Sequence, residues 1–106
     1  MERMKKMKQI STEEVEKQLA AGENLQLIDV REVDEVQEGH IPGIKHIPLG
    51  LLEFRLQELD KNTPYIIVCR SGGRSGLATA FLQERGYDAT NMTGGMQAWQ
   101  GILNRR

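Results

Sequence analysis

The residues best suited to chemistry lie together, directly after an apolar stretch. The β-branched run at residues 65–68 predicts a strand, and it ends at Cys69, the single cysteine of the chain. Residues 70–75 contain only arginine, serine and glycine, and helical spacing of apolar residues follows them. A strand, a tight loop and a helix N-terminus direct backbone N–H groups into the loop, where they stabilise a thiolate. We therefore predict that Cys69 is a nucleophile held in an anion-binding loop.

A structural role for this cysteine is the simpler alternative. A lone cysteine at the end of a buried strand often serves as a small core hydrophobe. The loop after it argues against that role, because arginine, serine and glycine offer almost nothing to a core. The composition of the loop favours a reactive cysteine.

The elements needed to position this loop alternate along the chain. Strands are expected near residues 9–10, 25–30, 45–47, 65–68 and 89–92. Helices are expected from a capping box at Ser11 and Glu14 to Gly22, over 32–37, over 48–59 and over 75–85, with a final one carrying residues 98–103. This alternation predicts an α/β fold: a small parallel sheet of about five strands, flanked by helices on both faces.

Two helices show how the expected faces are assigned. After Pro48, four leucines at spacings of three, four and three form one apolar stripe, which predicts an amphipathic helix packed on the core. In the helix over 32–37, Val33 and Val36 are expected to point inward.

In a parallel sheet ligands bind beyond the carboxyl ends of the strands. Asp29, Cys69 and the Gly94–Gly95 pair each follow a strand, so they should gather at that edge.

Length and composition limit the classes of function. The 106 residues form one domain, with residues 1–8 as a flexible basic leader and 9–106 as the folded unit. A net charge of −1 argues against general binding to nucleic acid or to anionic membranes. One cysteine allows no internal disulfide, and no long apolar run predicts a transmembrane helix. We expect a cytoplasmic monomer with no metal and no cofactor.

Four motifs, in this order, resemble one family over nearly the whole chain. They are the Asp-Val-Arg at 29–31, the Glu-Gly-His-Ile-Pro-Gly at 38–43, the loop at 69–75 and the Gly-Gly-Met-Gln-Ala-Trp at 94–99. Together they resemble a single-domain rhodanese, a sulfurtransferase module, from about residue 10 to residue 103. Ile44 and Met96 depart slightly from the usual pattern without touching the chemistry.

The resemblance implies that Cys69 carries a persulfide between two half-reactions. Its thiolate takes the outer sulfur of thiosulfate or a persulfide donor, and cyanide, a small thiol or a protein thiol then collects it. The physics of the loop agrees, because its N–H groups can stabilise an anionic sulfur, as an oxyanion hole stabilises oxygen. Two arginines can neutralise the donor, two glycines allow close approach, and Ser75 is expected to cap the helix and donate to the persulfide. The expected binding residues are Arg70, Ser71, Gly72, Gly73, Arg74 and Ser75.

The length of the cysteine loop and the single cysteine also bear on other possible functions. A phosphatase loop places five residues between cysteine and arginine, whereas only four separate Cys69 from Arg74, so this loop should fit a single sulfur atom. A dithiol redox role would need a second cysteine. A non-catalytic module for partner binding or sulfur relay is a third reading, which the intact loop disfavours.

The remaining polar residues of the motifs are expected to be mainly structural. His40 and His46 are the only histidines, and neither is needed as a base if the thiolate is already favoured. Asp29 and Arg31 could tune the electrostatics of the site or could form a buried ion pair that braces loops, with Glu38 as a further partner. The second reading is favoured, since such groups are seldom buried unpaired.

Overall fold

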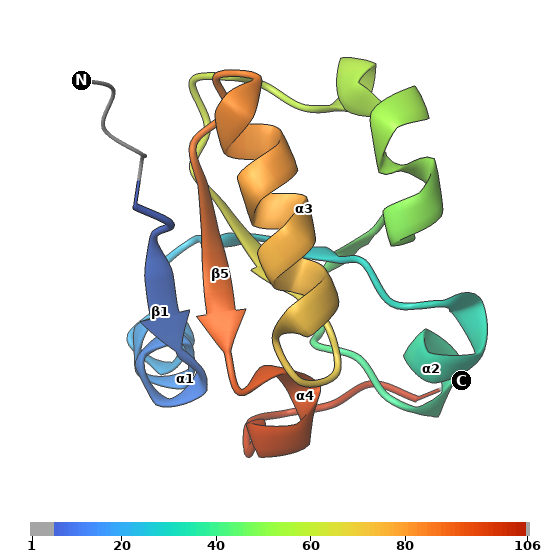
Figure 1. Cartoon of the computed structure of the whole chain (residues 1–106). Coiled ribbons are helices and arrows are strands. Elements are labelled where there is room, and N and C mark those ends of the chain that lie inside the picture. The colour runs from blue at the N-terminus through green and yellow to red at the C-terminus, as the bar shows by residue number, and fades with distance from the viewer. Residues whose placement is uncertain (1–5, 106) are drawn as a thin grey trace.

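The computed structural model describes residues 6–105 and shows a central five-stranded parallel sheet (Figure 1). The strands are β1 (Gln9–Ser11), β2 (Gln26–Asp29), β3 (Lys45–His46), β4 (Tyr65–Val68) and β5 (Ala89–Thr93), in the spatial order β1-β5-β4-β2-β3. All four pairings are parallel, so every strand ends at the same edge. The predicted fold class and strand number are confirmed.

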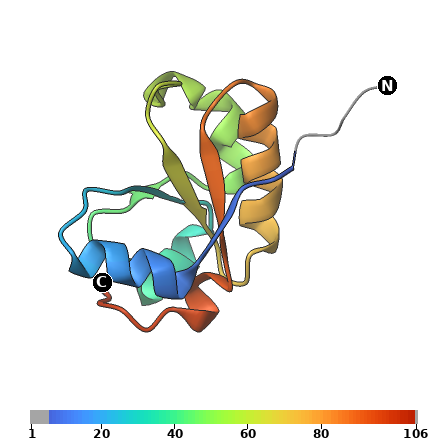
Figure 2. The same ribbon diagram turned by 90° about the vertical axis from the view of Figure 1, so that its left-hand side faces the viewer.

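Helices cover both faces of this sheet (Figures 1 and 2). The α-helices are α1 (Thr12–Ala20), α2 (Val33–Glu38), α3 (Gly73–Glu84) and α4 (Gly95–Ala98), and two 3-10 helices are η1 (Leu49–Phe54) and η2 (Leu56–Glu58). Side chains alternate along the strands and fill two cores. One core joins Ile28 and Ile67 to Leu82 of α3 and Leu52 of η1, and the other joins Val68 to helix α1.

The segment after Pro48 differs from the predicted amphipathic helix. It forms η1 and η2, separated at Arg55, with backbone bonds from Leu51 to Pro48 and from Arg55 to Leu52. A 3-10 helix has three residues per turn, which suits the spacing of the leucines, and Gly50 weakens a continuous α-helix here. The leucine stripe still packs on the core, with Leu52 only 2% exposed.

Two further expectations are wrong in detail. The final helix ends at Ala98, where Trp99 turns to an extended conformation, and Ile102 is 77% exposed. The cause is a backbone pairing of His40 with Asn104, which draws the chain away from a helical path. In α2, Val33 is 52% exposed instead of pointing inward, because this short helix lies at the sheet edge and buries no residue.

The N-terminal leader is only partly visible. Residues 1–5 lie outside the described residues, and Lys8 accepts a backbone hydrogen bond from Asn91 and pairs with Asp88. Nothing in the structure tests where the expected leader ends. None of the helices within residues 6–105 is both long and apolar enough to cross a membrane.

Candidate active site

Cys69 lies at the carboxyl end of β4, where the sheet edge meets the start of α3. The residue is 1% exposed, and its Sγ accepts a hydrogen bond from the Gly72 N–H at 3.1 Å. The Ser75 Oγ lies 3.3 Å from the same sulfur. Gly72 adopts φ +106°, a left-handed conformation that places its N–H toward the sulfur at a low cost only for glycine.

These contacts set the acidity of the thiol. Burial raises the pKa of Cys69, but hydrogen bonds from the Ser75 side chain and from the backbone N–H groups of Ser75, Gly72 and Ser71 outweigh it. The net result is a pKa below the usual value for cysteine. The loop therefore stabilises the thiolate, which is the nucleophilic form.

Ser75 contacts the reactive sulfur but does not cap the helix as predicted. The N-cap of α3 is Gly72, and Ser75 lies inside the first turn. The Ser75 hydroxyl also donates to Asn91 Oδ1 on β5, at 2.5 Å, while Asn91 Nδ2 donates to the Gly72 carbonyl. Asn91 thus links β5 to the cysteine loop.

The Gly94–Gly95 turn after β5 clamps this loop from the other side. The Met96 N–H donates to the Cys69 carbonyl and the Gln97 N–H to the Arg70 carbonyl, both at 2.8 Å. A Cβ on Gly95 would lie 2.5 Å from the Arg70 carbonyl group, and Gly95 has φ +57°. Glycine is required here for close backbone packing, which explains the second glycine of the motif.

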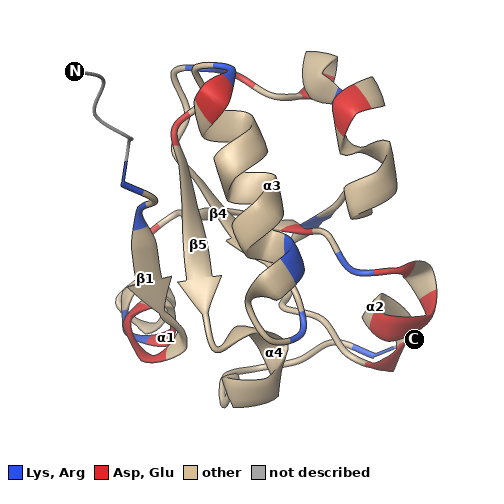
Figure 3. Ribbon diagram, viewed as in Figure 1, with Lys and Arg blue, Asp and Glu red and all other residues tan. Residues whose placement is uncertain are grey.

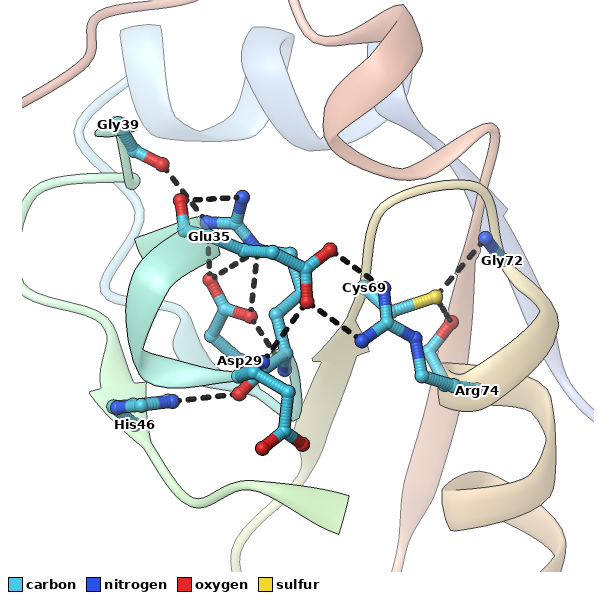
Figure 4. A network of polar contacts seen from close by, with 10 residues as sticks. Asp29, Glu35, Gly39, His46, Cys69, Gly72 and Arg74 are labelled. Atoms are coloured by element: carbon cyan, nitrogen blue, oxygen red, sulfur yellow. Dashed lines mark hydrogen bonds and ion pairs between the residues drawn. The ribbon is translucent and has the colours of Figure 1, made fainter. Parts of the chain in front are cut away.

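The two arginines of the loop have different surroundings. Arg74 forms a double hydrogen-bonded ion pair with Glu35 of α2, at 2.7 and 2.8 Å (Figure 4). The hydrogen bond from Arg74 holds the pKa of Glu35 down to about 2, so the pair is ionised at neutral pH. Arg70 is exposed and forms no ion pair with any residue of the described part of the chain.

A buried ion pair after β2, formed by Asp29 and Arg31, holds α2 beside the cysteine loop. Arg31 binds Asp29 through its Nε and Nη2, and both side chains are nearly inaccessible. Arg31 also donates to the backbone carbonyls of Glu35 and Gly39, so it holds the middle of α2 and its C-cap residue. Asp29 and Arg31 therefore form the expected buried ion pair, but their link to the site runs through Glu35 and not through Glu38.

The ring of each histidine contacts a backbone carbonyl. His40 Nδ1 lies 3.0 Å from the Val36 carbonyl oxygen, and His46 Nε2 lies 2.7 Å from the Arg31 carbonyl oxygen. Neither is hydrogen-bonded to Cys69. Among residues 6–105, no three histidine, cysteine or acidic side chains are grouped so that they could hold a metal ion.

An open pocket of about 320 Å³ lies beside the cysteine loop. Its charged lining comes from Arg31, Glu35, Glu38 and Arg70, and its apolar lining from Met96 and Leu103. Sequence reasoning missed Glu35, Asn91 and the pocket wall at Leu103. Each depends on a contact between distant segments, although the three-residue spacing of Glu32 and Glu35 is a capping-box signal for the start of α2.

Comparisons with known proteins agree with this geometry. The family model of the rhodanese-like domain matches residues 11–102. YtwF of Bacillus subtilis, which has a provisional sulfurtransferase name, is 44% identical over 95 residues, covering 90% of this chain and 92% of YtwF. Thiosulfate sulfurtransferase GlpE of Pseudoalteromonas translucida is 32% identical over 85 residues, covering 79% of this chain and 81% of GlpE.

A solved structure shows the same architecture. The crystal structure of a rhodanese-like domain protein from Staphylococcus aureus superposes with a TM-score of 0.89 at 38% identity. The match covers 94% of this chain and 99% of that one. With the cysteine loop, the Asp29–Arg31 pair and the Gly94–Gly95 clamp in place, the chain belongs to the rhodanese-like domain family.

Proposed function

We propose that the protein is a sulfurtransferase that carries a sulfane sulfur as a persulfide on Cys69. The observation that carries this proposal is the set of hydrogen bonds around Sγ, which lowers the pKa of the buried thiol. The sulfurtransferase names of the relatives support it. The donor is thiosulfate or a persulfide, and the acceptor is cyanide, a small thiol or a protein thiol.

In the first half-reaction the Cys69 thiolate attacks the outer sulfur of thiosulfate. A Cys69–sulfur bond forms, the sulfur–sulfur bond of the donor breaks, and its electron pair leaves with sulfite. Because Cys69 is only 1% exposed, the donor must approach end-on, with its terminal sulfur entering the loop. The exposed Arg70 guanidinium is free to bind the sulfonate end of the donor.

In the second half-reaction an acceptor attacks the outer sulfur of the Cys69 persulfide. Cyanide attacks the anionic persulfide left by the first half-reaction once its outer sulfur is polarised in the loop. A carbon–sulfur bond forms, the sulfur–sulfur bond breaks, thiocyanate leaves and the electron pair returns to Cys69 as its thiolate. The N–H groups of Ser71 and Gly72 stabilise the anionic sulfur between the steps, as a preorganised hydrogen-bond cage does for an oxyanion.

The loop is a poor fit to phosphoryl transfer. Its two ends are drawn together around one sulfur atom, and the Arg74 guanidinium, which a phosphate would need, is held by Glu35 at 2.7 Å. The geometry favours a sulfur carrier.

Intact mass spectrometry tests the proposal directly. After incubation with thiosulfate or a small persulfide, we expect the wild-type protein to gain one sulfur atom, which cyanide removes as thiocyanate. Cys69→Ser, which keeps the size of the side chain, should gain none. If wild-type Cys69 stays unmodified with both donors, sulfur transfer is wrong, and binding of a partner protein becomes the leading function.

A further inference from the structure

The charges in and around the pocket beside the cysteine loop cancel. The pocket is lined by Arg31, Arg70, Glu35 and Glu38. Arg31 is paired with Asp29, and Arg74 is paired with Glu35. Three arginines thus meet the three carboxylates of Asp29, Glu35 and Glu38, and Figure 3 shows acidic residues along the ribbon of α2 and basic residues at the start of α3. A donor with two negative charges therefore gains little net electrostatic attraction at this pocket.

Glu35 is the residue responsible for this balance. Its carboxylate accepts hydrogen bonds from both terminal nitrogens of Arg74, the second cation of the cysteine loop. The same carboxylate accepts the Glu32 N–H at 3.0 Å, and the Glu35 carbonyl receives Arg31. These contacts fix the carboxylate in place, so Arg74 is not free to turn toward the pocket.

The pocket also offers something that thiosulfate cannot use. Met96 and Leu103 form an apolar wall beside the charged residues, in the pocket that Arg70 of the cysteine loop also lines. Thiosulfate has no apolar part, whereas an organic persulfide carries a hydrocarbon chain next to its sulfur atoms. Burial of that chain against the wall favours the organic donor.

We propose that Glu35, by holding Arg74, makes the site selective for organic persulfides with a neutral or cationic carrier over dianionic thiosulfate. The inference rests on the sulfur transfer proposed above. In this reaction the Cys69 thiolate attacks the outer sulfur of the protonated persulfide. A Cys69–sulfur bond forms, the carrier leaves as its thiolate, and the proton stays on the new Cys69 persulfide.

Glu35→Gln tests this selectivity with two donors, thiosulfate and cysteamine persulfide, which carries an ammonium group. Glutamine keeps an oxygen to accept the Glu32 N–H but removes the negative charge that compensates Arg74. We expect the rate constant for persulfidation of Cys69 by thiosulfate to rise roughly three- to tenfold. The rate constant with cysteamine persulfide should not rise and should fall by no more than about threefold, because the ammonium group of this donor loses attraction, and this retained activity also shows that the variant is folded.

Two controls separate this effect from simpler ones. Asp34→Asn removes one negative charge from the same helix without touching Arg74 or the pocket, and it should leave the ratio of the two rate constants near the wild-type value. In an Arg74→Gln background, Glu35→Gln should no longer change that ratio, because the effect requires the uncompensated guanidinium.

The outcomes distinguish the inference from the proposed function. If Glu35→Gln accelerates both donors equally, it has only increased the thiolate fraction, and the selectivity inference is overturned. An unchanged or lower rate with thiosulfate overturns it as well. If neither donor modifies wild-type Cys69, the sulfur transfer itself fails.

Discussion

At the scale of single residues, the reactivity of Cys69 depends on one shared proton. The Ser75 hydroxyl is 2.5 Å from Asn91 Oδ1 and 3.3 Å from Cys69 Sγ, and it has one hydrogen to give. With the thiol protonated, Cys69 donates to Ser75 and Ser75 donates to Asn91. Once the thiolate forms, the Ser75 proton must turn toward the sulfur to stabilise it.

Removing this hydroxyl should therefore weaken the nucleophile. In Ser75→Ala we expect the pKa of Cys69 to rise, because the thiolate loses a hydrogen bond to its charged sulfur. Alkylation by iodoacetamide near neutral pH should be several-fold slower, and its pH profile should shift upward. Ser71→Ala is the matched control, because Ser71 contributes only its backbone N–H. Equal pH profiles for the two variants would contradict this role of Ser75.

At the scale of elements, the site is built where three segments meet: the loop before α3, helix α2 and the turn after β5. Arg74 and Glu35 join α3 to α2 across 39 positions of sequence. Met96 and Gln97 join α4 to the backbone of the cysteine loop. Each junction can be tested separately.

The α2–α3 junction should depend on pH. Arg74 lowers the pKa of Glu35 from 4.5 to about 2, so the pair stabilises the fold above pH 4.5 and loses this contribution as the pH falls toward 2. For this partly exposed pair we expect about 1 kcal/mol. Urea unfolding of wild type and Glu35→Gln should show a difference in free energy that shrinks over this range. A difference that stays constant down to pH 2 would argue against the pair.

The α4 junction should not tolerate a side chain at Gly95. Alanine there would place its Cβ 2.6 Å from the Cys69 carbonyl oxygen and would adopt φ +57°. We expect Gly95→Ala to lower the free energy of unfolding by about 2 kcal/mol or more and to slow persulfide formation. Gly73→Ala is the control, since a Cβ there meets no atom within 4 Å, and its free energy of unfolding should stay within about 1 kcal/mol of wild type. Equal losses in both variants would contradict the clamp.

At the scale of the whole molecule, local patterns predicted the sheet and its reactive edge but not the contacts between distant segments. The apolar run ending at Cys69 and the turn glycines are local signals, so the strand and loop were predicted correctly. Glu35, Asn91 and Asn104 act through partners 39, 16 and 64 positions away, for which the sequence carries no periodic signal. The segment after Pro48 forms two 3-10 helices and not the single helix predicted there, because the leucine spacing suits either helix type.

The C-terminal segment illustrates such a contact, because it supports α2 and the pocket from outside the sheet. Asn104 and His40 exchange backbone hydrogen bonds at 2.8 and 2.9 Å, and the Leu103 side chain lies 3.5 Å from the position of a Cβ on Gly39. Gly39 in turn accepts from Arg31, so the chain end reaches the ion-pair network of the site.

Asn104→Pro removes the backbone N–H that His40 needs, whereas Asn104→Ala keeps it. We expect the proline variant to lose about 1 kcal/mol of stability and to exchange the amide hydrogens around residues 38–41 faster, while β4 and β5 stay protected. Hydrogen exchange with mass spectrometry measures both regions in one experiment. The same exchange in both variants would mean that the 40–104 pairing does not hold this region. Faster exchange in the proline variant alone would show that α2, and with it the Glu35–Arg74 pair, is supported by the chain end.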